Sequence, residues 1–221
     1  MTTDEIGEIA VIGGTGALGG GLCRRWAKAG LSVIVGSRNA GKAAAFAETL
    51  PVAPGGPAVI GLGVGEAAAR GQIVVLAVPF ASQAATLAEI AAHIQGKILL
   101  DTTVPLVPPK VARVQLPPED SAAIRAQSLA GEGVRVISAF HNVAAKSLLK
   151  EGPIACDILV FGDDAAARDV GVVLVGRAGL RGVHGGPLAN SAAAEALTSV
   201  LISINKRYGA DGAGIVITGI G

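Results

Sequence analysis

This sequence has little of what several classes of protein require. Only 3% of its 221 residues are aromatic, and its 18 Lys and Arg residues are almost balanced by 17 Asp and Glu residues. A nearly neutral chain lacks the positive charge that attracts nucleic acid or anionic membranes. Few aromatic side chains also means few platforms on which single-stranded bases could stack. We therefore expect no nucleic-acid partner and favour a small molecule as the ligand.

Long apolar segments are missing too, although 51% of the residues are hydrophobic. The longest apolar run, Ile73–Ala81, has nine residues and is interrupted by Pro79, whereas a membrane-spanning helix needs about 20. The first five residues are polar and acidic, unlike the basic and then apolar start of a signal peptide. These features predict a cytoplasmic protein with no membrane segment.

Cysteine is scarce, with Cys23 and Cys156 as the two examples. They lie far apart in the sequence, and neither forms a CxxC pair or has a histidine close by. We expect two small buried side chains in a reducing compartment, with no disulfide and no metal site.

The chain does contain an alternation of short β-rich runs with alanine-rich helical stretches. The expected strands are residues 9–12, 32–36, 58–62, 73–78, 97–100, 134–138 and 157–161. The expected helices are residues 18–29, 40–50, 66–70, 81–93, 121–129, 165–177 and 188–208. This order predicts an α/β fold, a Rossmann-type doubly wound and mostly parallel sheet. We place it in residues 1–185, followed by a small C-terminal helical domain in residues 186–221.

Five prolines interrupt residues 102–120, which we expect to form a long ordered loop at the end of a strand. Ligands of such sheets bind outside the carboxyl ends of the strands. A long loop at that edge is therefore a candidate for substrate contact.

A GxGxxG motif, Gly14–Gly19, lies directly between the first expected strand and the first expected helix. Gly14 would permit the tight turn, Gly16 would let a pyrophosphate approach the backbone, and Gly19 would let the helix pack on the strand. The phosphates would bind at the helix N-terminus. A purely structural turn is the alternative. The candidate dinucleotide-binding residues here are Gly14, Thr15, Gly16, Ala17 and Leu18.

The end of the second expected strand suggests which dinucleotide binds. An NAD enzyme usually has Asp or Glu there for the ribose hydroxyls, but this chain has Ser37 and Arg38, with Lys42 one helical turn further on. A hydroxyl and two cations suit the 2′-phosphate of NADP. A solvated basic helix face is the alternative interpretation.

Two further candidates follow strands at the expected ligand edge. Val78 and Pro79 end the fourth strand and would form a wall for a nicotinamide ring, although core packing explains Val78 nearly as well. His141 follows the strand at 134–138 and would donate a proton or a hydrogen bond. A packed or capping histidine is an equally good interpretation.

Several segments together make the chain resemble the NADPH:coenzyme F420 oxidoreductases. They are Gly13–Gly19, Gly36–Arg38, Ser138–His141, Gly162–Asp164, Gly186–Asn190 and Glu195–Thr198. The resemblance covers nearly the whole chain and departs visibly at Ala17, where the family often has Asn. It implies that a hydride passes directly between the nicotinamide and the deazaflavin of coenzyme F420. It also implies a homodimer, with deazaflavin contacts from His141, Val143 and Thr198.

The last expected helix carries an apolar stripe, formed by Ala194, Leu197, Leu201, Ile204 and Tyr208. Because the chain shows no obvious partner for this stripe, we expect it to pack across a dimer. Thr198 would lie about 100° around the helix from Leu197 and face the ligand. Glu195 would lie in the first turn of this helix, where the dipole favours an acidic residue.

Two other functions remain open from the sequence. One is an NADPH-dependent reductase on the same scaffold with another acceptor, such as a flavin or ferric ion, an imine or a pterin. The other is a non-catalytic NADP-sensing protein, which would bind the dinucleotide without reducing any acceptor.

Overall fold

The structure is a computed structural model that describes residues 6–220. Its described strands form one eight-stranded sheet in the order β3-β2-β1-β4-β5-β6-β7-β8. The strands are β1 (Ile9–Ile12), β2 (Val33–Ser37), β3 (Ile60–Gly63), β4 (Ile73–Leu76), β5 (Ile98–Asp101), β6 (Arg135–Ser138), β7 (Asp157–Gly162) and β8 (Arg181–Gly186).

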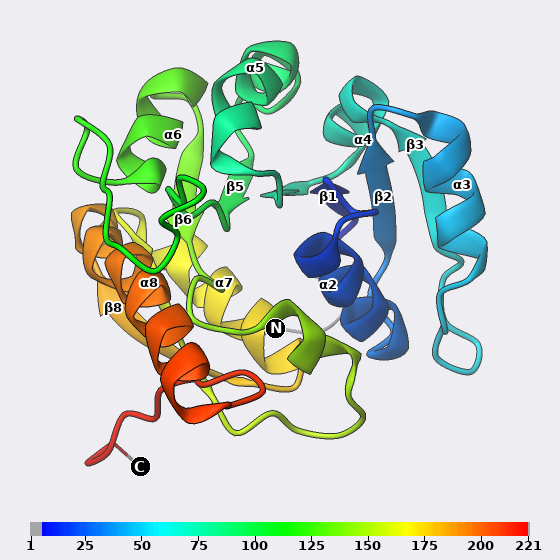
Figure 1. The fold of residues 1–221 in the computed structure, drawn as a ribbon. Coiled ribbons are helices and arrows are strands. Elements are labelled where there is room, and N and C mark those ends of the chain that lie inside the picture. Colours follow the sequence, from blue (N-terminus) through cyan, green and yellow to red (C-terminus); the bar gives the residue numbers. More distant parts are fainter. Residues whose placement is uncertain (1–5, 221) are drawn as a thin grey trace.

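Helices cover both faces of this sheet (Figure 1). The α-helices are α2 (Ala17–Lys28), α3 (Ala40–Glu48), α4 (Val64–Arg70), α5 (Phe80–Ile90), α6 (Ala122–Ala130), α7 (Ala165–Arg177) and α8 (Ser191–Tyr208). Short 3-10 turns are η1 (Ala91–His93), η2 (Ala145–Leu149) and η3 (Leu188–Asn190). One apolar core joins the sheet to α2, α3 and α7, and a second joins it to α4, α5 and α6.

The predicted fold class is confirmed. Strands β1 to β6 pair in parallel, with β1 at the centre between β2 and β4. β1 and β4 are buried along their whole length, as strands covered on both faces must be. The stretch between Asp101 and Ala122 contains no helix or strand, so the proline-rich loop is also confirmed.

Three details add to the prediction or depart from it. β7 runs antiparallel to β6, which is consistent with the expected mostly parallel sheet, but the sequence did not indicate which strand is reversed. β8 was not expected, because its sequence RGVHGG has three glycines and little apolar alternation. The last helix begins with the 3-10 turn η3 before α8 starts. The boundary expected between residues 185 and 186 falls at the end of β8.

The reversal of β7 gives it an unusual place at the sheet edge. Only two residue pairs join it to β6, Ile137 with Gly162 and Ser138 with Phe161. The first four residues of β7 therefore extend past the carboxyl end of β6, and β8 runs parallel beside them. Beyond β6, the Asn142 side chain donates to the carbonyl of Asp157 over 2.7 Å. β7 and β8 thus form a ribbon that overhangs the carboxyl edge of the parallel strands.

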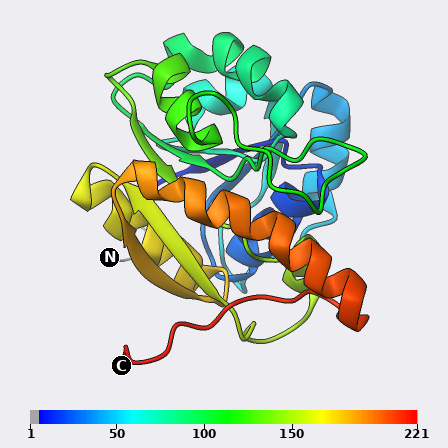
Figure 2. The same ribbon diagram turned by 60° about the vertical axis from the view of Figure 1, so that its left-hand side comes forward.

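Helix α8 lies across this overhang beside the proline-rich loop (Figure 2). It packs against α6, η3 and β7. Ala194 and Leu201 are buried within the chain, so the expectation that the whole stripe lacks an internal partner is wrong. The other end of the helix is open, with Ile204 37% and Tyr208 77% exposed. No helix among residues 6–220 is long and apolar enough to cross a membrane.

Candidate active site

The glycine turn between β1 and α2 is shaped by close backbone approaches. Gly13 has a φ of +86°, and a Cβ atom there would lie 2.3 Å from the carbonyl oxygen of Ala77. Gly13, which precedes the motif, is thus the residue of this turn with left-handed backbone, while a Cβ at Gly14 would lie 2.8 Å from the carbonyl oxygen of Val11. The N–H of Gly14 donates to the carbonyls of Val11 and Gly36, each over 3.1 Å. A Cβ at Gly19 would lie 2.5 Å from the Gly13 carbonyl oxygen, so glycine there lets α2 pack closely.

The first turn of α2 presents open backbone donors. Gly16 is the N-cap and has no side chain to cap the helix. Among residues 6–220, no backbone carbonyl or side chain accepts a hydrogen bond from the N–H groups of Thr15, Ala17 or Leu18. Open amides and the positive end of the helix dipole together favour an anion such as a phosphate.

A cavity of about 370 Å³ lies beside this turn, within the usual size range of small-molecule sites. The carboxyl ends of β1, β2 and β4 and one face of α5 form its walls. It brings together six of the expected cofactor-binding residues: Thr15, Gly16, Ser37, Arg38, Val78 and Pro79. Residues not singled out by the sequence complete the lining from α5: Ala81, Ser82, Ala85, Thr86 and Glu89.

The basic end of the cavity follows β2. Asn39 caps α3 by accepting from the N–H of Lys42 over 2.9 Å, which fixes the start of that helix. Arg38 borders the cavity, and Lys42 lies further along α3, outside the lining. Both side chains are exposed, and neither forms an ion pair with another residue of the described chain.

Besides Lys42, six expected residues lie outside this cavity, and one of them, Ala17, is exposed at the start of α2. Gly14 is buried in the turn, and Leu18 packs against the core beneath α2. Val143 also packs against that core. The two others, His141 and Thr198, contact each other at the carboxyl end of β6, where the Thr198 hydroxyl donates to the His141 carbonyl over 2.7 Å.

The His141 ring is buried, with 3% of the residue exposed. Its Nε2 lies 2.7 Å from the hydroxyl of Ser138. Burial lowers the pKa of the imidazole to about 4, so the ring is neutral at pH 7. Its other nitrogen, Nδ1, is buried and has no hydrogen-bond partner among the described residues. The ring can therefore exchange hydrogen bonds, but it does not carry the proton of an imidazolium acid.

Comparison with known proteins decides the family. The family model described as "NADP oxidoreductase coenzyme F420-dependent" matches residues 8–105. The F420-dependent NADP reductase of Methanothermobacter thermautotrophicus is 40% identical over 96% of this chain and 95% of its own. That of Methanocaldococcus jannaschii is 36% identical over 96% and 99%. The chain belongs to the F420-dependent NADP reductase family.

Solved structures agree with this assignment. A putative F420-dependent NADP reductase from Arthrobacter sp. FB24 superposes with a TM-score of 0.81, at 27% identity over 96% of this chain and 99% of that one. A reductive aminase from Aspergillus terreus shares the fold, with a TM-score of 0.63 and 21% identity over 92% of this chain and 63% of its own.

This member of the family also has a buried polar network that sequence reasoning missed. Glu195 accepts from the N–H groups of Ala122 and Ala123 over 2.7 and 3.1 Å, at the start of α6. Glu195 thus caps α6. It lies beyond the first turn of its own helix, α8, so the prediction that it favours the dipole of that first turn is wrong. The Gln83 amide donates to Asp101 and to the Ala122 carbonyl, each over 2.9 Å. The regular spacing of the polar residues 191, 195 and 198 along α8 was the feature of the sequence that could have indicated this network.

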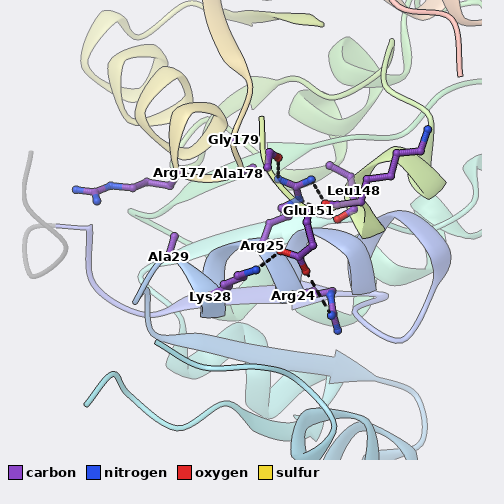
Figure 3. A pocket seen from close by; sticks show the side chains of 11 residues that line it. Arg24, Arg25, Lys28, Ala29, Leu148, Glu151, Arg177, Ala178 and Gly179 are labelled. Carbon is purple, nitrogen blue, oxygen red and sulfur yellow. Dashed lines mark hydrogen bonds and ion pairs between the residues drawn. The ribbon is translucent and has the colours of Figure 1, made fainter. Parts of the chain in front are cut away.

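A second cavity, of about 220 Å³, lies at the opposite end of α2 and is rich in cations (Figure 3). Its charges are largely satisfied within the chain. The guanidinium of Arg25 donates to the carbonyls of Leu148 and Gly152 over 2.8 and 2.7 Å, and Lys28 pairs with Glu151. We interpret this cluster as an anchor for the segment that leads from His141 to β7.

Proposed function

We propose that this protein transfers a hydride directly between the nicotinamide of NADP(H) and the deazaflavin of coenzyme F420. The observation that supports this most strongly is the 40% identity, over 96% of the chain, to an enzyme named F420-dependent NADP reductase. The glycine turn and the basic end of the cavity agree with the dinucleotide half of that reaction. The protein is accordingly an oxidoreductase with two cosubstrates.

The residues present fit an NADP molecule. A pyrophosphate would approach the open amides of Thr15 and Ala17, at a place where a Cβ on Gly16 would already lie 3.1 Å from the Gly13 carbonyl oxygen. Arg38, with Ser37 and Lys42, would hold the 2′-phosphate.

Val78 and Pro79 would form an apolar wall for the nicotinamide. This wall stands at the carboxyl ends of the strands, where such sheets bind their ligands.

The deazaflavin would lie against His141, Val143 and Thr198. Two buried polar atoms at this place, His141 Nδ1 and Asn142 Oδ1, have no partner among the described residues. Such atoms are costly to bury unpaired, so a ligand with hydrogen-bonding edges that reached them would stabilise this part of the protein. We propose that the neutral His141 orients the deazaflavin by a hydrogen bond.

Little chemistry is then left to the side chains. When bound, the two carriers supply the hydride chemistry themselves. The chain binds both, holds their rings in contact and keeps water away from them.

We further propose a homodimer that buries the open end of α8. Val200 (45% exposed), Ile204 (37%) and Tyr208 (77%) present apolar surface there. Two-fold pairing of this surface is the simplest way to cover it. We place the enzyme in the cytoplasm, because both of its cysteines are free and buried.

The deciding experiment mixes the purified protein with NADPH and oxidised coenzyme F420 and follows the loss of the deazaflavin's visible absorbance. FMN, a cyclic imine and a dihydropterin serve as parallel acceptors. We expect rapid reduction of the deazaflavin alone. Faster turnover of another acceptor would overturn the assignment, and NADPH binding with no turnover of any acceptor would favour a sensing protein.

A further inference from the structure

One face of α8 carries polar residues into the protein. Ser191, Glu195, Thr198 and Ser199 follow one another at spacings of four, three and one residues, which places them on one side of a helix. Ser191 bonds to Ser121 over 3.0 Å, and Ser199 donates to the carbonyl of Arg113 in the proline-rich loop over 3.2 Å. With the contacts of Glu195 and Thr198, α8 is tied to three separate segments at the carboxyl edge of the sheet.

Glu195 is the most constrained of these residues. It is 1% exposed, and both of its oxygens accept from backbone N–H groups in the first turn of α6. Burial raises its pKa to about 7, and the nearby Asp101 acts in the same direction, while the two amides oppose the shift. A buried carboxylate of this kind is weak evidence for stability, because its desolvation offsets much of what its bonds contribute. Its bonds do fix the relative position of two helices.

The contacts of Glu195 close a ring around the end of the sheet. On one side, Ala122 connects through Gln83 to Asp101 at the end of β5. Asp101 is the register partner of Ser138 at the end of β6, and Ser138 contacts the ring of His141. On the other side, one turn along α8, Thr198 holds the His141 carbonyl.

We propose that Glu195 is a positioning residue, which fixes α8 on α6 so that Thr198 and His141 keep their places on the deazaflavin side of the site. The inference rests on the proposed deazaflavin contact of Thr198 and goes beyond it. Glu195 itself is enclosed by protein and does not contact the cavity beside the glycine turn. The chain of contacts from Glu195 to His141 passes through α5, β5 and β6. It does not pass through the glycine turn or the end of β2. Loss of Glu195 should therefore affect the two cosubstrates unequally.

The test is Glu195→Gln, which keeps the shape of the side chain but accepts from only one of the two amides, since its NH2 group faces the other N–H. We expect the KM for coenzyme F420 to rise roughly fivefold or more, while the Kd for NADPH changes less than twofold. Amide hydrogen exchange of α8 and of residues 141–143 should become faster. Glu132→Gln, at an exposed carboxylate in the turn after α6, is the matched control and should match the wild type in all three measurements.

A second variant disrupts the same contact from the other side. Ala122 is the first residue of α6, where proline is tolerated, and the Ser121 before it already has extended backbone. Ala122→Pro removes the N–H that donates to Glu195 without changing that glutamate. We expect the same selective rise in the KM for coenzyme F420, so the proposal is still tested if Glu195→Gln does not fold.

Thr198→Val separates this inference from the proposed function. If Thr198→Val raises the KM for coenzyme F420 and both disrupting variants leave it unchanged, the deazaflavin site stands and the positioning role is wrong. If none of the three variants changes that KM, the Thr198 contact and the positioning role both fail. Equal losses for NADPH and coenzyme F420 in the disrupting variants would show a general structural role and overturn the proposal.

Discussion

Replacing His141 by glutamine should change how the free energy of unfolding depends on pH. The buried ring has a pKa of about 4, against 6.5 for an ordinary histidine. Between these values the unfolded chain takes up a proton that the folded protein does not. The stability from this group is therefore present above pH 6.5 and is lost as the pH falls toward 4. The gap between the two pKa values corresponds to about 3 kcal/mol.

The wild-type curve alone cannot isolate this effect. Burial raises the pKa of Asp101 to about 6 and that of Glu195 to about 7, and both groups titrate in the same pH range. Their effect on the pH dependence of the unfolding free energy is opposite to that of His141. A raised carboxyl pKa favours the folded state at low pH and disfavours it as the pH rises. The informative quantity is the difference in unfolding free energy between the wild type and His141→Gln at each pH.

Urea unfolding followed by circular dichroism, in steps from pH 4 to 7.5, supplies this difference. We expect the difference in unfolding free energy to fall by about 3 kcal/mol from pH 7.5 to pH 4. His93→Gln, at an exposed histidine, is measured in parallel as the control. A flat difference for His141→Gln would refute the argument, since the ring would then titrate equally in the folded and unfolded chain.

Three further predictions concern binding and assembly. Arg38→Glu should weaken NADPH binding by roughly 1.5–3 kcal/mol, about ten- to a hundredfold, and spare NADH; calorimetry showing equal losses would reject the 2′-phosphate role. Gly16→Val should abolish dinucleotide binding while the circular dichroism spectrum stays unchanged, because the side chain would fill the phosphate site; normal NADPH binding would make the turn purely structural. Leu201 is buried within the chain, so the dimer is better tested by Ile204→Asp, which should convert the dimer to monomers in sedimentation at micromolar concentration; a monomeric wild type would contradict the dimer.

The parts of the fold that the sequence predicts well are those where local signals agree with one another. The runs at β1 and β4 are apolar throughout, and glycine or proline punctuates the segments next to them. Strands buried on both faces need such continuous apolar runs, so their composition reveals them. The glycine turn was also predictable in position, because its spacing depends on backbone contacts within a few residues. The need for glycine at Gly13 could not be predicted in the same way, since it comes from close contact with Ala77, which follows a distant strand.

The parts that could not be predicted depend on contacts between distant segments. The direction of β7 is set by where the chain re-enters the sheet after the segment anchored by Arg25, and no local pattern records it. The role of Glu195 depends on α6, more than 60 residues earlier in the chain. A buried acidic residue on an amphipathic helix looks like a surface residue until its partner is known. The polar spacing on α8 carried this signal, but the apolar stripe on the same helix was more conspicuous.

In the described chain, the ribbon of β7 and β8 is joined to the rest of the sheet only by the short ladder to β6, and α7 packs against both of its strands. At this ladder a Cβ on Gly162 would lie 2.8 Å from the Ile137 side chain, and on α7 a Cβ on Gly171 would lie 2.7 Å from the side chain of Val160 in β7. Glycine at these two positions lets β7 pack closely on β6 and on α7. Helix α8 packs against β7, η3 and α6, and so connects the ribbon to the parallel part of the domain. A change in the length or packing of α8 would therefore move the proposed deazaflavin side of the site, while the strands around the proposed dinucleotide cavity stay in place.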